Sequence, residues 1–282
     1  MLWLVLWIVV LAMGAFGVMA SANSLRFGRR VAQDARQMWT GAAEPHPIDR
    51  GWIEGLPTPV RRYAEKAVGE RQRAVRSVRL RHGGTFRPKL DGVWMPIRGD
   101  EYFAADPPGF VWWGRVRAAP GLWVDARDRS VGGVGSMLIS AESTFTLAES
   151  AGPEMDQGAL LRLLGEMPLL PTALLDPRYV TWTAVDDRRA GATLRVNGRE
   201  AAGVFEFGDD GLPTSFLADR QRDLGGGRSV LTPWSGELAD YREVDGMLAP
   251  HRMAASWHVD GKPIPYVRFL VETLEYDTTA PF

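Results

Sequence analysis

The sequence of 282 residues contains no cysteine and only four histidines. Without cysteine, the chain can form no disulfide, no thiolate-based zinc or iron–sulfur site and no thiolate nucleophile. The histidines, His46, His82, His251 and His258, are scattered and match neither an H-x-H nor an H-E-x-x-H pattern. We therefore expect no bound metal and no cofactor.

Lysine is also scarce, because only Lys66, Lys89 and Lys262 accompany the arginines among the 33 basic residues. The formal net charge of −1 argues against a nucleic-acid partner. The charge is unevenly spread, however, since ten basic residues lie between Val60 and Lys89. This basic block needs an explanation of its own.

Arginines of the block alternate with apolar residues around Arg79 and Arg81, as on one face of a strand. They are typical of a charged sheet surface or a protected edge. The alternative is attraction to anionic lipid head groups, which contributes about 1 kcal/mol per basic residue near the membrane surface. The residues that we predict to contact a membrane surface are Arg73, Arg76, Arg79 and Arg81.

No charged side chain occurs in residues 1–25, "MLWLVLWIVVLAMGAFGVMASANSL". A helix needs about 20 apolar residues to cross a bilayer, so the run is long enough. Trp3 and Trp7 lie near one end, where indoles favour the head-group boundary, and Arg26 begins a basic flank. We predict a single-pass transmembrane anchor over residues 1–25.

A cleaved signal peptide is the alternative, because Ala20-Ser21-Ala22 resembles a cleavage site. The missing basic n-region and the length of the run favour a retained anchor in a cytoplasmic membrane. By the positive-inside rule, the positive charge that follows the span favours the cytoplasm for the rest of the chain, and the side of the membrane stays open.

After a linker over residues 26–56, residues 57–282 are expected to form a single globular domain. Its first element is an amphipathic helix that starts near Pro57, and residues 31–39 could extend the anchor as helix. From Arg73 onward, short segments alternate with period two, and Asn-Gly or Asp-Gly pairs recur between them. Such pairs form tight hairpin turns, so an antiparallel meander is predicted.

One helical unit interrupts the strands at residues 150–177. Pro153 begins it, Glu154 and Asp156 lie in its first turn, and Pro168 ends the helix. Its wide leucine stripe is suited to packing against a sheet.

The most polar stretch, "DYREVDGMLAPHR" at residues 240–252, resembles an active site at first sight. Asp245-Gly246 predicts a hairpin corner, and the carboxylates beside it are typical of a solvated turn. In the following strand His251 and His258 fall on opposite faces, so they cannot share a metal. We interpret the stretch as a turn, and no catalytic residue is assigned.

Several blocks together resemble a known family: "LPTPVRRYAEKA", "HGGTFRP", "GFVWWGRV", "GPEMDQGALLRLLGEMPLLPTALL" and "TPWSGELADYREVDGMLAPHRMAASW". They are similar to a bacterial family of membrane-anchored proteins of unknown function, which implies no catalytic residues. The late hairpin is more distantly similar to the lipoprotein-carrier (LolA/LolB-like) architecture. That similarity implies a curved sheet around helices with an apolar cavity, and a domain in the periplasm.

The predicted fold is α+β: a curved, half-barrel-like antiparallel sheet packed on a short helical unit, preceded by one N-terminal transmembrane helix. The leading functional hypothesis is a membrane-anchored, non-enzymatic protein that binds a lipid or other hydrophobic ligand at the bacterial envelope. A structural or protein-interaction module without a small ligand is the alternative, and a hydrolase is the third hypothesis. No particular protein partner follows from the sequence.

A ligand pocket is expected between the helical unit and the sheet, although apolar stripes usually close on each other as core. An acyl chain in such a pocket would gain about 0.8 kcal/mol per buried CH₂. The residues predicted to line the pocket are Leu160, Leu161, Leu164, Met167, Trp182, Trp234, Met253 and Trp257, with Arg162, Tyr241 and Arg242 holding a polar head group.

Overall fold

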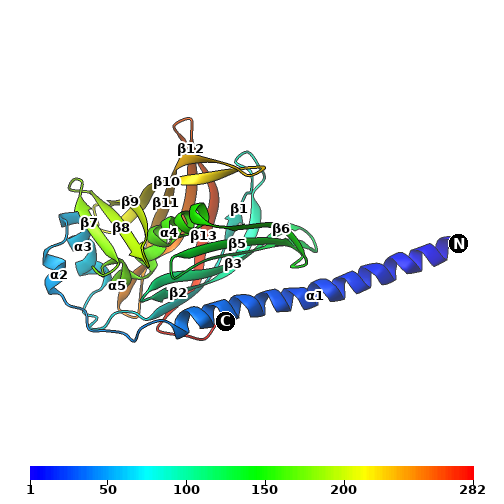
Figure 1. The fold of residues 1–282 in the computed structure, drawn as a ribbon, viewed down its shortest axis with the longest axis horizontal. Helices are drawn as coiled ribbons and strands as arrows, with labels where there is room; N and C mark the ends of the chain where they lie inside the picture. Colours follow the sequence, from blue (N-terminus) through cyan, green and yellow to red (C-terminus); the bar gives the residue numbers. More distant parts are fainter.

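Thirteen strands form one open antiparallel sheet in the computed structural model, which describes residues 1–282 (Figure 1). The spatial order is β6-β5-β4-β3-β2-β1-β13-β12-β11-β10-β9-β8-β7. The strands are β1 Ser77–Phe86, β2 Met95–Ala105, β3 Pro108–Ala119, β4 Leu122–Val131, β5 Val134–Ala141, β6 Phe145–Ala151, β7 Val180–Ala184, β8 Arg189–Val196, β9 Arg199–Phe207, β10 Pro213–Gly225, β11 Arg228–Val244, β12 Met247–Val259 and β13 Lys262–Tyr276.

The sheet consists of two meanders, β1–β6 and β7–β13, that join where β1 pairs with β13. Tight turns connect most neighbouring strands, as the Asn-Gly and Asp-Gly pairs predict, whereas Asp91-Gly92 lies in the longer connection 87–94 between β1 and β2. At Asn197-Gly198, Asp245-Gly246 and Asp260-Gly261 both residues have positive φ, which two-residue type I′ hairpins require. The predicted meander is therefore confirmed.

The helical unit links the two meanders and consists of α4 Pro153–Glu166, a 3₁₀ turn Met167–Leu169 and α5 Pro171–Leu174. Helix α4 contacts β4 and β5 of one meander and β9 and β10 of the other, so the sheet curves around it (Figure 1). Helices α2 Gly51–Glu54 and α3 Thr58–Ala67 lie at the β7 end of the molecule. The α+β class and the curved sheet agree with the sequence prediction.

Each strand presents one face to α4 and one face away from it, which we name the inner face and the outer face. In β13, Val267, Phe269 and Val271 are buried, whereas Arg268 and Leu270 between them are exposed. This period-two pattern follows from the strand geometry. The inner faces, α3 and the helical unit together enclose the main apolar core of 47 buried residues.

Helix α1, Leu2–Thr40, is continuous over 39 residues and projects from the domain (Figure 1). The apolar part of α1 is long and apolar enough to cross a membrane. A signal sequence near an N-terminus meets the same criteria of length and composition. Residues 26–40, where the linker was expected to begin, continue the helix and pack on the outer face of β2 and β3. The contacting residues of the helix are Phe27, Val31, Ala35, Met38 and Trp39.

Candidate functional site

The leucine stripe of α4 lies within the main core rather than beside an open space. Leu160, Leu161, Leu164 and Met167 are each at most 2% exposed. The helix lies close to the sheet here, because a Cβ added at Gly165 would come within 2.9 Å of the Phe216 ring. A role of this stripe in ligand binding stays a prediction.

The structure brings three of the predicted lining residues together on the inner face of β11 and β12. Trp234 and Trp257 are register partners, and Met253 lies further along the same face. The Trp234 indole donates a hydrogen bond to the Tyr266 hydroxyl at 3.0 Å, and Trp257 stacks on the same ring. Trp182 lies apart from them on β7, where its ring packs on Phe205.

The predicted head-group residues do not share one site. The Tyr241 hydroxyl donates to the Pro213 carbonyl at 2.8 Å, and burial raises its pKa well above the ordinary value. Arg242 is exposed and pairs with Asp240 at 2.7 Å, near the hairpin end. Arg162 is buried under the sheet, so no common mouth is formed.

Three carboxylates surround the Arg162 guanidinium in the interior. Its Nη2 lies 2.6 Å from Glu101 Oε1, its Nη1 lies 2.8 Å from Asp128 Oδ2, and its Nε lies 3.1 Å from Glu166 Oε1. The second oxygens of Glu101 and Asp128 have no hydrogen-bond partner. One cation therefore faces more negative charge than it can neutralise when all three carboxyls are ionised.

The excess of carboxyl groups changes their protonation. Burial, reinforced by the Glu166 charge, raises the pKa of Glu101 well above the ordinary value, and burial also raises the pKa of Glu166. Burial alone would lower the pKa of Arg162, but the charges of Glu166, Glu101 and Asp128 outweigh it and raise that pKa. The cluster therefore contains a permanent cation and two acids, Glu101 and Glu166, that tend to retain a proton.

An aromatic wall extends this cluster along the inner face. The guanidinium of Arg162 lies 4.8 Å from the Trp112 ring centroid, and the Trp112 indole donates to His82 Nε2 at 2.9 Å. His82 in turn packs on Phe269 at 3.9 Å between centroids. Burial lowers the pKa of His82 to about 3, so its imidazole is a neutral acceptor at physiological pH.

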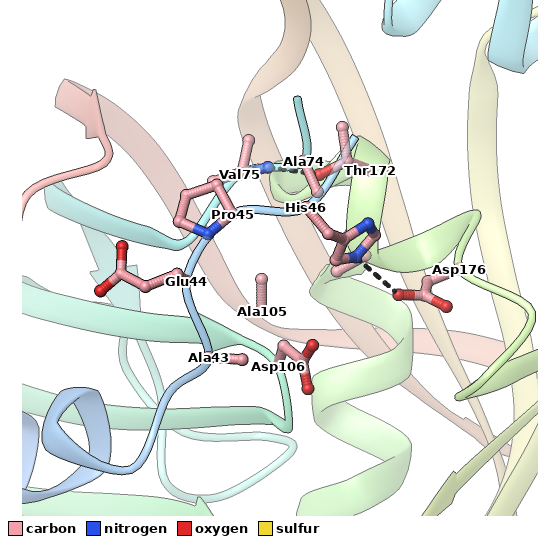
Figure 2. A pocket seen from close by; sticks show the side chains of 11 residues that line it. Ala43, Glu44, Pro45, His46, Ala74, Val75, Ala105, Asp106, Thr172 and Asp176 are labelled. Carbon is pink, nitrogen blue, oxygen red and sulfur yellow. Dashed lines mark hydrogen bonds and ion pairs between the residues drawn. The ribbon is translucent and has the colours of Figure 1, made fainter. Parts of the chain in front are cut away.

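A second polar junction lies where the segment before α2 crosses the helical unit. Figure 2 shows His46 pointing at Asp176, with Nε2 and Oδ2 3.4 Å apart. Arg178 bridges Asp176 and Asp106 at 2.6 and 2.8 Å. The cavity here is about 10 Å³, space for no more than a water molecule. The junction therefore ties the segment to the domain and offers no room for an organic ligand.

A larger groove, of about 620 Å³, lies across β1 and β10–β13. Volumes of 300–1,000 Å³ are typical of ligand sites. Its exposed side chains alternate with buried Leu238, Met253 and Phe269, which places the groove on the outer face. The outer-face residues that line it are Thr85, Thr214, Glu237, Ala239, Arg252, Ala254, Arg268 and Leu270.

Small and aliphatic side chains form the floor of this groove, and two arginines flank it. Ala254 is half-buried, while Leu270 is 54% exposed, although it lies in the middle of a sheet. Arg252 is the register partner of Leu270, and the guanidinium of Arg268 lies 4.6 Å from the ring centroid of Trp94. Neither arginine forms a salt bridge with a carboxylate. An apolar floor beside unpaired cations is suited to an amphiphile with a negative head group.

The outer face has a second, more open groove of about 530 Å³ across β7–β12. Its lining includes Thr193, Ala202, Leu217 and Asp219. No arginine lines this groove, so it differs from the first in charge but resembles it in size.

The basic block forms ion pairs and carbonyl contacts within the protein. Arg73 contacts the Pro45 carbonyl, and the other three arginines pair with acids at 2.6 to 3.2 Å. Arg79 and Arg81 also stack on the Phe282 ring. Contact of these residues with a membrane stays a prediction. The acids are Glu44 for Arg76, Glu275 for Arg79 and Asp100 for Arg81.

Arg252, Arg268 and Leu270 are not among the ligand-binding residues predicted from the sequence. Their only signal is a break in the alternation of β13, where aliphatic Leu270 occupies an outward position between Arg268 and Glu272. Strand pairing then brings Leu270 beside Arg252, 18 residues earlier in the chain. That pairing cannot be read from one strand alone.

Comparison with known proteins identifies the family. Residues 46–269 match the family of unknown function DUF6544, and the chain belongs to this family. The family resemblance predicted from the sequence is therefore confirmed. A comparison with curated proteins finds no match.

Two solved structures of bacterial proteins are similar to the chain. One is an outer membrane lipoprotein-sorting protein domain from Vibrio parahaemolyticus, with 10% identity and a TM-score of 0.38, covering 72% of this chain and 86% of that one. The other is a LolA superfamily protein from Nitrosomonas europaea, with 8% identity and a TM-score of 0.36, covering 78% and 92%. This degree of likeness is too low to transfer a ligand.

Proposed function

We propose that this protein is a membrane-tethered, non-catalytic binding protein for a lipid or other hydrophobic ligand with an anionic head group. The outer groove flanked by Arg252 and Arg268 is the observation that carries the proposal. Helix α1 is the tether, and the envelope of a bacterium is the proposed location.

The groove supplies two kinds of interaction to such a ligand. An acyl chain laid on Ala239, Ala254 and Leu270 is removed from water, which contributes about 0.8 kcal/mol per buried CH₂. A carboxylate or phosphate accepts charge-assisted hydrogen bonds from Arg252 or Arg268, which are stronger than neutral ones. Neither interaction requires a nucleophile, a general base or a metal.

Photo-crosslinking to the full chain in lipid nanodiscs tests the proposal. A photoactivatable fatty acid should label peptides of β12 and β13 in the parent protein. Ala254→Trp fills the groove and should reduce this labelling about tenfold, the effect of about 1.4 kcal/mol. Ala202→Trp places the same side chain in the other groove and is the matched control, for which full labelling is expected.

Two results would contradict the proposal. One is equal labelling of β12 and β13 in the parent protein and in Ala254→Trp. The other is labelling that Ala202→Trp abolishes and Ala254→Trp leaves intact, which would assign the ligand to the second groove.

A further inference from the structure

Helix α1 contacts the sheet before its apolar segment has ended. The rings of Phe16 and Phe145 stack with centroids 6.3 Å apart. About two turns further along the helix, Asn23 Nδ2 donates to Thr144 Oγ1 at 3.1 Å. Arg115 on β3 donates to Ser24 Oγ at 2.7 Å. These contacts fix the turn between β5 and β6 beside the last part of the apolar segment.

The spacing along α1 sets the depth of this turn when α1 spans a bilayer. A hydrocarbon core of about 30 Å takes about 20 helical residues at about 1.5 Å each. The first charge after the span is Arg26, so the core ends between Ala20 and Leu25. Phe16 then lies about 6 Å or more inside the core. The ring centroid of Phe145 is 6.3 Å from that of Phe16, which puts Phe145 at the edge of the core or within it.

The side chains at this end of the sheet suit a lipid environment. Leu122, the first residue of β4, is 54% exposed, and Phe145 and Leu147 at the start of β6 are 54% and 60% exposed. No charged residue occurs between positions 143 and 148. Exposed apolar residues grouped in this way are typical of a membrane contact.

The polar groups of the two turns are satisfied within the protein, as insertion into lipid requires. Glu142 accepts a hydrogen bond from the Trp123 backbone amide at 2.8 Å. The Thr144 amide donates to the Ala141 carbonyl at 2.9 Å, and the Trp123 indole donates to Asp125 at 2.9 Å. Two carboxylates lie near the tip, and both are buried: Glu142 is 6% exposed and Asp125 is 0% exposed.

Exposed arginines follow the apolar segment of α1 and flank the β3–β4 turn. Arg26, Arg29 and Arg30 on α1 and Arg117 on β3 are suited to contact lipid phosphates. Arg79 and Arg81 stack on Phe282, which packs against Tyr102 under the last turns of α1. Arg79 and Arg81 therefore lie near the C-terminal end of α1, which is about 14 helical residues, or about 20 Å, from the end of the span.

We propose that the β3–β4 and β5–β6 turns insert into the lipid bilayer beside α1, with Leu122, Phe145 and Leu147 in contact with acyl chains. The inference rests on the proposed role of α1 as a span. The bilayer contact then holds the domain in one orientation on the membrane surface, because a helix and two turns enter the lipid together.

Depth-dependent fluorescence quenching tests this inference, and the absence of cysteine makes site-specific labelling direct. The full chain is reconstituted in phosphatidylcholine–phosphatidylglycerol vesicles with one environment-sensitive dye at a time. Labelled sites are Phe145→Cys and Leu122→Cys in the turns and Val10→Cys in the span. Leu231→Cys, at an exposed position of β11, is the control outside the membrane.

Lipids that carry a spin label on the acyl chain should quench both turn sites by at least half as much as Val10→Cys. They should leave Leu231→Cys unquenched. Quenching at Val10→Cys with none at either turn site would overturn the inference but keep the span. No quenching at Val10→Cys would remove the span, and the inference with it.

Discussion

Arg252 and Arg268 differ from most arginines on the outer face, because they have no carboxylate partner. Arg81 pairs with Asp100 and Arg242 with Asp240, so their charges are partly neutralised. A guanidinium without a hydrogen-bonded carboxylate is available to pair with an anion, although the charge of Arg252 also acts on Asp240 and Glu237 lines the same groove.

The double variant Arg252→Gln/Arg268→Gln separates this attraction from the apolar contact. Crosslinking of a photoactivatable fatty acid should fall about tenfold, because charge-assisted hydrogen bonds are lost. Crosslinking of its methyl ester, which has no charge, should change less than twofold. An equal loss for acid and ester would indicate that the arginines only shape the groove.

The buried carboxyl groups around Arg162 make stability depend on pH. The pKa of Glu101 is raised in the folded state by burial, whereas in the unfolded chain it is about 4.3. A raised carboxyl pKa means that stability is fully present below the unfolded value and is lost as the pH rises through the folded value. His82, with its pKa lowered to about 3, acts in the opposite direction below about pH 6.5.

Glu101→Gln should remove the loss of stability that accompanies ionisation of Glu101. The amide oxygen of the glutamine can still accept the hydrogen bond from Arg162. Between pH 5 and pH 8 the free energy of unfolding of the parent should fall relative to the variant. The change should be about 1.4 kcal/mol for each pKa unit of the shift that the pH range covers. Urea unfolding at a series of pH values measures this, and the His82 contribution cancels because both proteins contain it. A stability difference independent of pH would contradict the protonation account.

Helix α4 packs against strands of both meanders, in addition to the pairing of β1 with β13 that joins them. Leu164→Ala should therefore lower the free energy of unfolding by about 2–5 kcal/mol, as expected for a fully buried leucine. Leu231→Ala is the matched control, because Leu231 is 57% exposed and should change stability by less than about 0.5 kcal/mol. Similar effects at both positions, measured by urea unfolding, would mean that α4 is not part of the cooperative core.

The elements themselves were largely predictable from local sequence. Period-two alternation and Asp-Gly or Asn-Gly pairs predicted the hairpins, because both depend on residues close in the chain. Pro153, the first-turn acids and Pro168 predicted the start and end of α4. Helix α3 starts one residue after Pro57, in agreement with the amphipathic pattern.

The arrangement of the elements was less predictable, because it depends on contacts between distant residues. The pairing of β1 with β13 joins residues almost 200 positions apart, such as Val78 and Tyr276. The outer groove exists only after five strands are in register. A leucine stripe also looks the same whether it lines a pocket or packs as core, so the burial of α4 had to come from the structure.

At the scale of the whole molecule, the C-terminal half of α1 is packed against the domain. Trp39 donates to the Phe103 carbonyl at 2.8 Å, and Asp34 pairs with Arg127 at 2.9 Å. Cleavage after Ala22 would remove the contact of Phe16 with Phe145 and would leave the contacts of residues 23–39. We expect intact-mass measurement of the membrane-extracted protein to show residues 1–25 retained. A mature protein beginning at Asn23 would contradict the tether.

The central claim is that the outer groove holds a lipid or similar amphiphile, and lipid analysis of the purified protein tests it most directly. The full chain, Ala254→Trp and Ala202→Trp are extracted in mild detergent, and co-purifying molecules are identified by mass spectrometry without a preselected target. The account predicts one class of anionic amphiphile near equimolar amount with the parent and with Ala202→Trp, and a loss of about tenfold with Ala254→Trp. The same lipids in the same amounts with all three proteins would contradict it.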